Sequence, residues 1–248
     1  MKRREFLASC GCIGTAPLLV HAGTTSRRPL EIRYWFSPGA AQYQIHGKVR
    51  GYLQRALQPV FSPLQISYGG VAPVNNEHGY YVTSDGEWPM KVMLGYGSRG
   101  GVEPARDVNL LITDGPLRPD PPGVARRTKA SIGGARRMAE APPCEEIGEY
   151  EPYRGPLYAM QILIHEVGHV LGLAHEHGSI TRLEDGVAAS PMVSGYAWTP
   201  RAQNFSDDVS HCGDPYPEDR YGIRYLSMDF STCARSALRD YRTPVRPN

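Results

Sequence analysis

The feature that most constrains this chain is the segment 165–175, which reads HEVGHVLGLAH. His165 and His169 are four residues apart, so a helix places both side chains on one face, about one turn apart. Two imidazoles in that arrangement can share a single metal ion. A helix is expected here, because Pro156 suits the first turn of a helix and an apolar stripe at helical spacing follows it.

A third ligand must come from outside this helix. His175 lies ten residues after His165, and a continuous helix would carry it about 15 Å further along the axis. Ligands of one ion lie within a few Å of each other, so the chain must turn back after His169. Gly172 stands where this turn is needed, and glycine adopts positive φ at little cost. Glu166 is then well placed to reach a water on the metal.

The pattern H-E-x-x-H-x-x-G-x-x-H resembles the zinc signature of the metzincin metalloproteases, in which a Met-turn follows the histidines. Met192, within Ser-Pro-Met-Val-Ser-Gly-Tyr, is similar to that methionine. The resemblance implies a zinc-dependent endopeptidase with one catalytic Zn²⁺ held by His165, His169 and His175. It also implies that Met192 forms a floor beneath them and that Glu166 acts as general base and then acid. Core packing is the alternative reading of Met192.

Shorter matches point to different branches of that superfamily. Glu176, directly after the third histidine, resembles the glutamate at that place in astacins. The Phe-Ser-Thr-Cys segment at 230–233 instead resembles the start of the last helix in adamalysin-like enzymes. A tyrosine two residues after the methionine is common in the family, but here Tyr196 is four residues on. Tyr196 and Trp198 are expected to line the oxyanion region or the pocket beyond the scissile bond, with core packing as the alternative for both.

Periodicity and the resemblance together predict an α+β fold: a metzincin-like domain with a twisted mixed sheet, two long helices and an irregular C-terminal subdomain ending in a helix. We expect strands at 30–36, 64–68 and 108–113, and helices at 41–57, 155–171 and 231–241. The Gly- and Pro-rich segment 69–106 predicts loop and hairpin with a strand at 91–96, and 178–230 predicts loops. The segment 128–135 is the candidate edge strand to which a peptide substrate would add.

Residues 1–22 have the features of an export signal: a basic start, an apolar stretch and small residues before Gly23. The run Arg-Arg-Glu-Phe-Leu at 3–7 is similar to the twin-arginine motif, with an ordinary secretory signal as the alternative. We therefore expect a periplasmic or secreted protein. Residues 23–248 would form one metalloprotease domain, with an upper subdomain at about 23–176 and a lower one at about 177–243.

The family resemblance implies a protein or peptide substrate, and the charge balance does not suggest another class of partner. Without residues 1–22, Lys and Arg fall from 27 to 24 and Asp and Glu from 25 to 24, which leaves the chain near neutral. No basic patch suggests nucleic acid, and no apolar run is long enough to span a membrane. We expect a monomer. An acidic stretch could bind Ca²⁺, although its spacing matches no recognised loop: Asp207, Asp208, Asp214, Glu218 and Asp219.

Three cysteines remain after the leader: Cys144, Cys212 and Cys233. An odd number in an exported protein predicts one disulfide and one free thiol. The adamalysin-like resemblance implies Cys144–Cys233, the pairing we expect, whereas proximity in the sequence favours Cys212–Cys233.

Two other functions remain open from the sequence. One is a zinc-binding module that holds peptides without cleaving them, which the presence of Glu166 disfavours. The other is a zinc hydrolase of a different class, with a downstream glutamate such as Glu184 as a ligand in place of His175.

Overall fold

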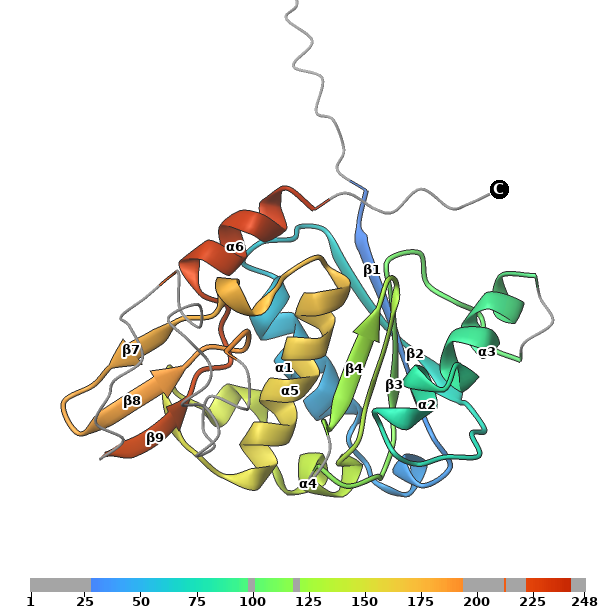
Figure 1. Ribbon diagram of the computed structural model, residues 1–248, viewed down its shortest axis with the longest axis horizontal. Coiled ribbons are helices and arrows are strands. Elements are labelled where there is room, and N and C mark those ends of the chain that lie inside the picture. The colour runs from blue at the N-terminus through green and yellow to red at the C-terminus, as the bar shows by residue number, and fades with distance from the viewer. Residues whose placement is uncertain (1–27, 98–100, 118–120, 194–211, 213–221, 242–248) are drawn as a thin grey trace, which may run out of the picture.

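The computed structural model describes residues 28–97, 101–117, 121–193, 212 and 222–241 (Figure 1). It has the expected α+β fold, with two sheets and helices on both faces of the larger one. The predicted export signal at 1–22, Tyr196, Trp198 and the five acidic residues between 207 and 219 lie outside the described residues. Within the described ranges, no helix combines the length and the apolar character that a membrane crossing requires.

The larger sheet has five strands in the order β2-β1-β3-β5-β4. β1 pairs in parallel with β2 and β3, β3 pairs in parallel with β5, and β4 pairs antiparallel with β5, so the sheet is mixed. The central strand β3 is buried along its whole length, Asn109 included, as its largely apolar sequence predicts. The strands are β1 Leu30–Phe36, β2 Leu64–Val71, β3 Val108–Ile112, β4 Gly123–Arg126 and β5 Lys129–Ile132.

Helices cover both faces of this sheet. The long helices α1 (His46–Leu57) and α5 (Gly155–Val170), with α4 (Ala135–Glu140), pack on one face and enclose the main core. The short helices α2 (Tyr81–Ser84) and α3 (Glu87–Tyr96) cover the other face, where Trp88 packs edge-on against Trp35. Figure 1 shows α5 beside β4, which places the predicted metal helix at the β4 end of the sheet.

A second, smaller sheet has the strand order β6-β9-β8-β7, with β6 before the metal helix in the chain and the other three strands after it. Its strands are β6 Glu151–Pro152, β7 Ile180–Arg182, β8 Gly186–Ala189 and β9 Ile223–Leu226. The last helix, α6 (Thr232–Arg239), begins as predicted, because the Ser231 side chain accepts a hydrogen bond from the backbone of Ala234.

Several local predictions were wrong. The helix expected at 41–57 begins only at His46, because Tyr43 is extended after a short 3-10 turn, η1 (Ala40–Gln42). The segment 69–106 is not a hairpin but contains α2 and α3. The strand expected at 91–96 is helical, because Trp88, Val92 and Gly95 recur at helical spacing and are buried together. The described part of the segment 178–230, which was expected to form loops, contains three short strands.

The edge-strand prediction was also wrong. Lys129–Ile132 forms β5, which is an interior strand between β3 and β4. The hairpin joining β4 to β5 places β4 at the edge instead. The sequence did not predict β4, because this short strand lies in a Pro- and Arg-rich segment that resembles a loop. A peptide that adds to this sheet next to α5 would therefore meet β4.

The expected disulfide between Cys144 and Cys233 is not formed. Cys233 bonds to Cys212, and Cys144 is a free, half-buried thiol. Cys144 opens the short 3-10 turn η2 (Cys144–Glu146) beside α1, and its Cβ lies 3.1 Å from the place where a Cβ on Gly51 would sit. The pairing favoured by short separation in the sequence is thus the one found.

Candidate metal centre

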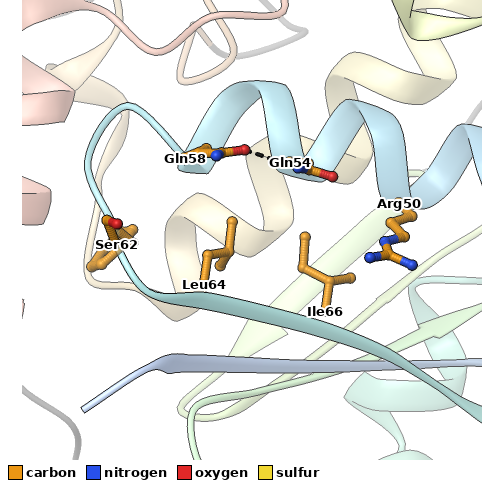
Figure 2. Close-up of a pocket in the computed structure, with 7 residues that line it drawn as sticks. Arg50, Gln54, Gln58, Ser62, Leu64 and Ile66 are labelled. Carbon is orange, nitrogen blue, oxygen red and sulfur yellow. Dashed lines mark hydrogen bonds between the residues drawn. The ribbon is translucent and has the colours of Figure 1, made fainter. Parts of the chain in front are cut away.

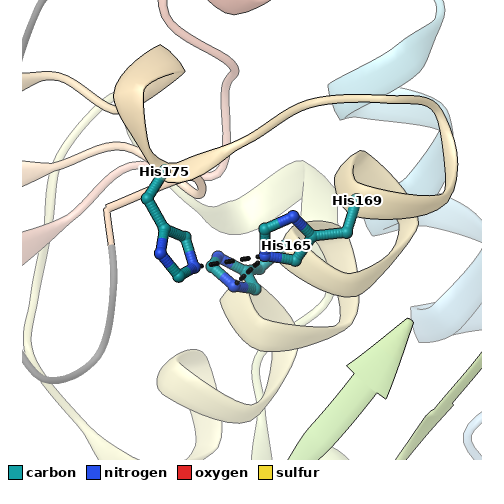
Figure 3. Close-up of side chains that lie close together, drawn as sticks. All are labelled: His165, His169 and His175. Atoms are coloured by element: carbon teal, nitrogen blue, oxygen red, sulfur yellow. Dashed lines mark hydrogen bonds between the residues drawn. The ribbon is translucent and has the colours of Figure 1, made fainter. Parts of the chain in front are cut away.

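The helix α5 carries the first two histidines of the predicted site. It begins at Gly155 with Pro156 in its first turn, where the missing N–H of proline costs nothing. All but a few of its side chains are buried, so the helix is fixed in the core between the two sheets. His165 and His169 project from its last turns toward the same point (Figure 3).

The turn after α5 brings His175 back. Gly172 has φ of +89°, its N–H bonds the carbonyl of His169, and the N–H of Leu173 bonds the carbonyl of Gly168. These two bonds form a Schellman motif, which ends a helix at a glycine. His175 then opens a 3-10 turn, η3 (His175–His177). The predicted role of Gly172 is therefore confirmed.

The three imidazoles converge on one point. Nε2 of His169 lies 2.9 Å from Nε2 of His165 and 3.2 Å from Nε2 of His175 (Figure 3). One ring nitrogen from each residue falls within 4.8 Å of the others, so the three can hold a metal ion together. Nitrogens bound about 2.0–2.1 Å from a tetrahedral ion are about 3.3 Å apart, close to the separations found here.

The hydrogen bonds of the Nδ1 atoms show why the contacts between Nε2 atoms are not ordinary hydrogen bonds. Nδ1 of His165 lies 2.6 Å from the carbonyl oxygen of Pro191, and Nδ1 of His169 lies 2.8 Å from that of Leu173. A carbonyl oxygen can only accept, so each Nδ1 carries the proton and each Nε2 presents a lone pair. Two lone pairs facing each other at 2.9 Å repel unless a cation lies between them.

Burial keeps these histidines neutral, which is the form that binds metals. The pKa of His165 is lowered to about 3, first by burial and then by the neighbouring His169, while the hydrogen bond to Pro191 opposes the shift. Burial is also the main cause of the lowered pKa of His169 and of His175. The site therefore holds three neutral imidazoles at neutral pH.

Glu166 lies beside the histidines in the interior, at only 5% exposure. Burial raises its pKa to about 8. Its side chain contacts the start of the edge strand, since a Cβ built on Gly123 would lie 2.9 Å from Cγ of Glu166. The absence of a side chain at Gly123 is therefore what allows β4 to pass so close to this carboxyl group.

Met192 is fully buried against the metal helix. A Cβ built on Gly168 would lie 2.5 Å from its sulfur, so the sulfur packs directly on the backbone of α5 between the two histidines of that helix. The role of Met192 as a floor beneath the three histidines stays a prediction from the family resemblance. Gly168 provides the space, a role that the sequence motif did not reveal.

Gln161 is a further residue that sequence reasoning missed. It is buried on α5, and its Nε2 donates to the carbonyls of Ala189 and Ser227 at 2.8 and 2.9 Å. These bonds tie the ends of β8 and β9 to the metal helix, just before the segment that supplies the carbonyl of Pro191. Its role could have been predicted, because it is a lone amide side chain in an otherwise apolar helix, one turn before the first histidine.

The region after His175 is fixed in a similar way. Nδ1 of His177 accepts from the N–H of Ala174 at 3.0 Å, and Ser231 Oγ donates to the carbonyl of His177 at 2.6 Å. Glu184 is exposed in the turn between β7 and β8 and is not part of the histidine cluster. The arrangement therefore favours His175 over Glu184 as the third ligand.

A hollow of a different kind lies between α1 and β2 (Figure 2). Its lining includes Arg50, Leu64 and the side chains of Gln54 and Gln58, which are hydrogen-bonded to each other at 2.9 Å. Because β2 and β4 are opposite edges of the sheet, this hollow is separate from the histidines. The hollow is therefore not part of the candidate metal centre.

No protein-family model matches this chain, and no curated protein sequence matches it either. Among solved structures, the chain is similar to archaemetzincin from Methanopyrus kandleri, with 16% sequence identity and a TM-score of 0.38. The matched part covers 58% of this chain and 76% of the archaemetzincin chain. The function proposed below rests on the geometry of the site.

Proposed function

We propose that this protein is a zinc-dependent endopeptidase whose metal ion is held by His165, His169 and His175. The observation that carries this proposal is the convergence of their Nε2 atoms, two of which have lone pairs directed at each other. A cation at that point removes the repulsion, and neutral imidazole suits zinc.

The ligand set also supports a catalytic metal over a structural one. Structural zinc sites have four protein ligands, whereas catalytic sites have three and leave a position open. The cluster found in the described residues contains three. When bound, zinc would lower the pKa of a water and polarise the carbonyl of the substrate.

Glu166 is the proposed general base. It follows His165 directly, faces the edge strand and is buried, so its carboxylate is a stronger base than one in water. It would take the proton of the attacking water and deliver it to the leaving amine. His165 and His169 would keep their orientation through the carbonyls of Pro191 and Leu173.

The proposed substrate is an extended segment of peptide or protein. Among the described residues, the edge strand β4 pairs with one strand, β5, and it begins against Glu166. An extended peptide that pairs with the open side of β4 would bring its backbone past the base. Export through residues 1–22, and action on substrates outside the cytoplasm, stay predictions from the sequence.

Hydrolysis of a peptide library tests the proposal, with cleavage products read by mass spectrometry. The zinc-loaded wild type should cleave, and removal of the metal by a chelator should abolish cleavage. Glu166→Gln should keep one zinc per chain and lose about 10²–10⁴-fold in rate. If the zinc-loaded wild type leaves a varied library intact, the protein is instead a zinc-binding module that holds peptides.

A further inference from the structure

Three cations gather at the tip of the β4–β5 hairpin. Arg126 ends β4 and is directly opposite Lys129, the first residue of β5, with Arg127 in the two-residue connection. Arg126 and Arg127 are exposed, and Lys129 is half-buried. Lys129 has a lowered pKa, caused first by burial and then by the charge of Arg127.

The fold itself does not favour this arrangement. Like charges directly opposite each other on paired strands are destabilising. Arg127 has φ of +54°, at a hairpin position where glycine or asparagine is usual. None of the ion pairs among the described residues includes Arg126, Arg127 or Lys129. A cluster that costs stability and has no acidic partner within the described chain is a candidate for ligand recognition.

The tip is fixed relative to the proposed catalytic base. β4 starts at Gly123, against Glu166, and ends three residues later at Arg126. With about 3.3 Å per residue, the cationic tip lies about 10 Å along the strand from the base. A peptide paired with the open side of β4 would thus extend from the base to the tip in about three residues.

The direction of the peptide follows from the strand. Antiparallel pairs are the commoner kind, and β4 already pairs antiparallel with β5. In an antiparallel arrangement, the peptide residue opposite Arg126 lies about three residues before the residue opposite Gly123. Side chains directly opposite on paired strands point to the same face, so an acidic side chain there would meet Arg126.

We propose that the tip of the β4–β5 hairpin, with Arg126, Arg127 and Lys129, selects substrates with an acidic residue about three positions before the cleaved bond. This inference rests on the proposed peptidase function. It adds a substrate class, peptides acidic on the N-terminal side of the cleavage site, and assigns it to named residues.

The first experiment compares cleavage of matched peptides by the zinc-loaded protein. The peptides are based on a sequence that the wild type cleaves. Each carries Glu, Gln or Lys at one of the four positions before the cleaved bond, and the positions are substituted one at a time. We expect the Glu peptide to exceed the Gln peptide about three- to fivefold in kcat/KM when the substituted position is near the third. This advantage should shrink in 0.5 M salt, because exposed charges are screened.

The key variant is Arg126→Glu, which replaces a repulsive pair with an attractive Glu–Lys129 pair and so should not impair folding. It should remove the preference for Glu and favour Lys at the same position. Arg50→Glu, an equal charge change near β2 at the opposite edge of the sheet, should leave the preference unchanged. Equal kcat/KM for the Glu and Gln peptides at all four positions in the wild type would overturn the inference.

A binding measurement separates this inference from the proposed function. Zinc-loaded Glu166→Gln protein would be titrated with fluorescein-labelled decapeptides that differ only in Glu or Gln at a single position, which is moved along the peptide. Tighter binding of the Glu peptide, lost on adding Arg126→Glu, supports recognition at the tip even if no peptide is cleaved. Equal binding of the two peptides overturns it even if cleavage is observed.

Discussion

The carbonyl oxygen of Pro191 lies 2.6 Å from Nδ1 of His165, which links the segment after β8 to the first histidine of the metal helix. This contact fixes the proton on Nδ1 and turns Nε2 toward the other two imidazoles. The geometry of the site therefore depends on how the second sheet is attached to α5, and Gln161 makes that attachment.

Replacing Gln161 with Leu tests this dependence. The variant leaves the carbonyls of Ala189 and Ser227 without their donor, so the free energy of unfolding should fall by about 1–3 kcal/mol. Zinc affinity, measured by competition with a chelator, should fall about tenfold, because Pro191 is no longer held in place. Gln54→Leu, on the surface of α1, should change neither quantity. Unchanged zinc affinity in Gln161→Leu would show that Pro191 is positioned without it.

Gly168→Ala should move Met192. Alanine usually stabilises a helix relative to glycine by up to about 1 kcal/mol, but here the new Cβ would lie 2.5 Å from the sulfur of Met192. Overpacking of this kind costs about 1–3 kcal/mol, so we expect a lower melting temperature and weaker zinc binding. Gly47→Ala, on α1 with open space around it, is the matched control and should not destabilise. Equal behaviour of the two variants would contradict the packing described here.

The free energy of unfolding should depend on pH through the protonation of the buried Glu166. In the metal-free protein its pKa is about 8, above the ordinary 4.5, so the folded state holds a proton that the unfolded state releases. Its contribution to stability is therefore complete below pH 4.5 and is lost as the pH rises toward 8. The unfolding free energy of the wild type minus that of Glu166→Gln should fall by about 1.4 kcal/mol per pH unit between these values. Urea titrations from pH 5 to 7.5 measure it, and a flat difference would contradict the burial of Glu166.

Removing the disulfide should destabilise the C-terminal part of the chain. Cys212 and Cys233 are 21 residues apart, and closing a loop of that size stabilises by about 3 kcal/mol in the chain-entropy model. Cys212→Ser should therefore lower the melting temperature, whereas Cys144→Ser should have little effect. The opposite ranking of these two variants would point to the pairing of Cys144 with Cys233.

Much of the site could be predicted from the sequence, because its geometry is local. The spacing of the histidines and Gly172 required a helix followed by a sharp turn, and both are present. The central strand was equally clear, because β3 is buried on both faces and its sequence is apolar except at Asn109.

The missed features depend on contacts between distant segments. β4 is a four-residue strand whose edge position is set by its pairing with β5, and no local pattern encodes that order. Gly123 and Gly168 matter because Glu166 and Met192 approach them in space. The helices α2 and α3 were concealed by Gly86, Pro89 and Gly95, although their buried residues form a core cluster with Trp35 and Leu111 of the sheet.

X-ray absorption spectroscopy of bound zinc tests the central claim most directly. The account predicts one zinc per chain in the wild type, with three imidazole nitrogens about 2.0–2.1 Å from the metal. In His175→Ala the number of imidazoles should fall to two and the affinity should drop sharply, whereas Glu184→Gln should match the wild type. Two imidazoles in the wild type, or full zinc binding by His175→Ala, would contradict the account.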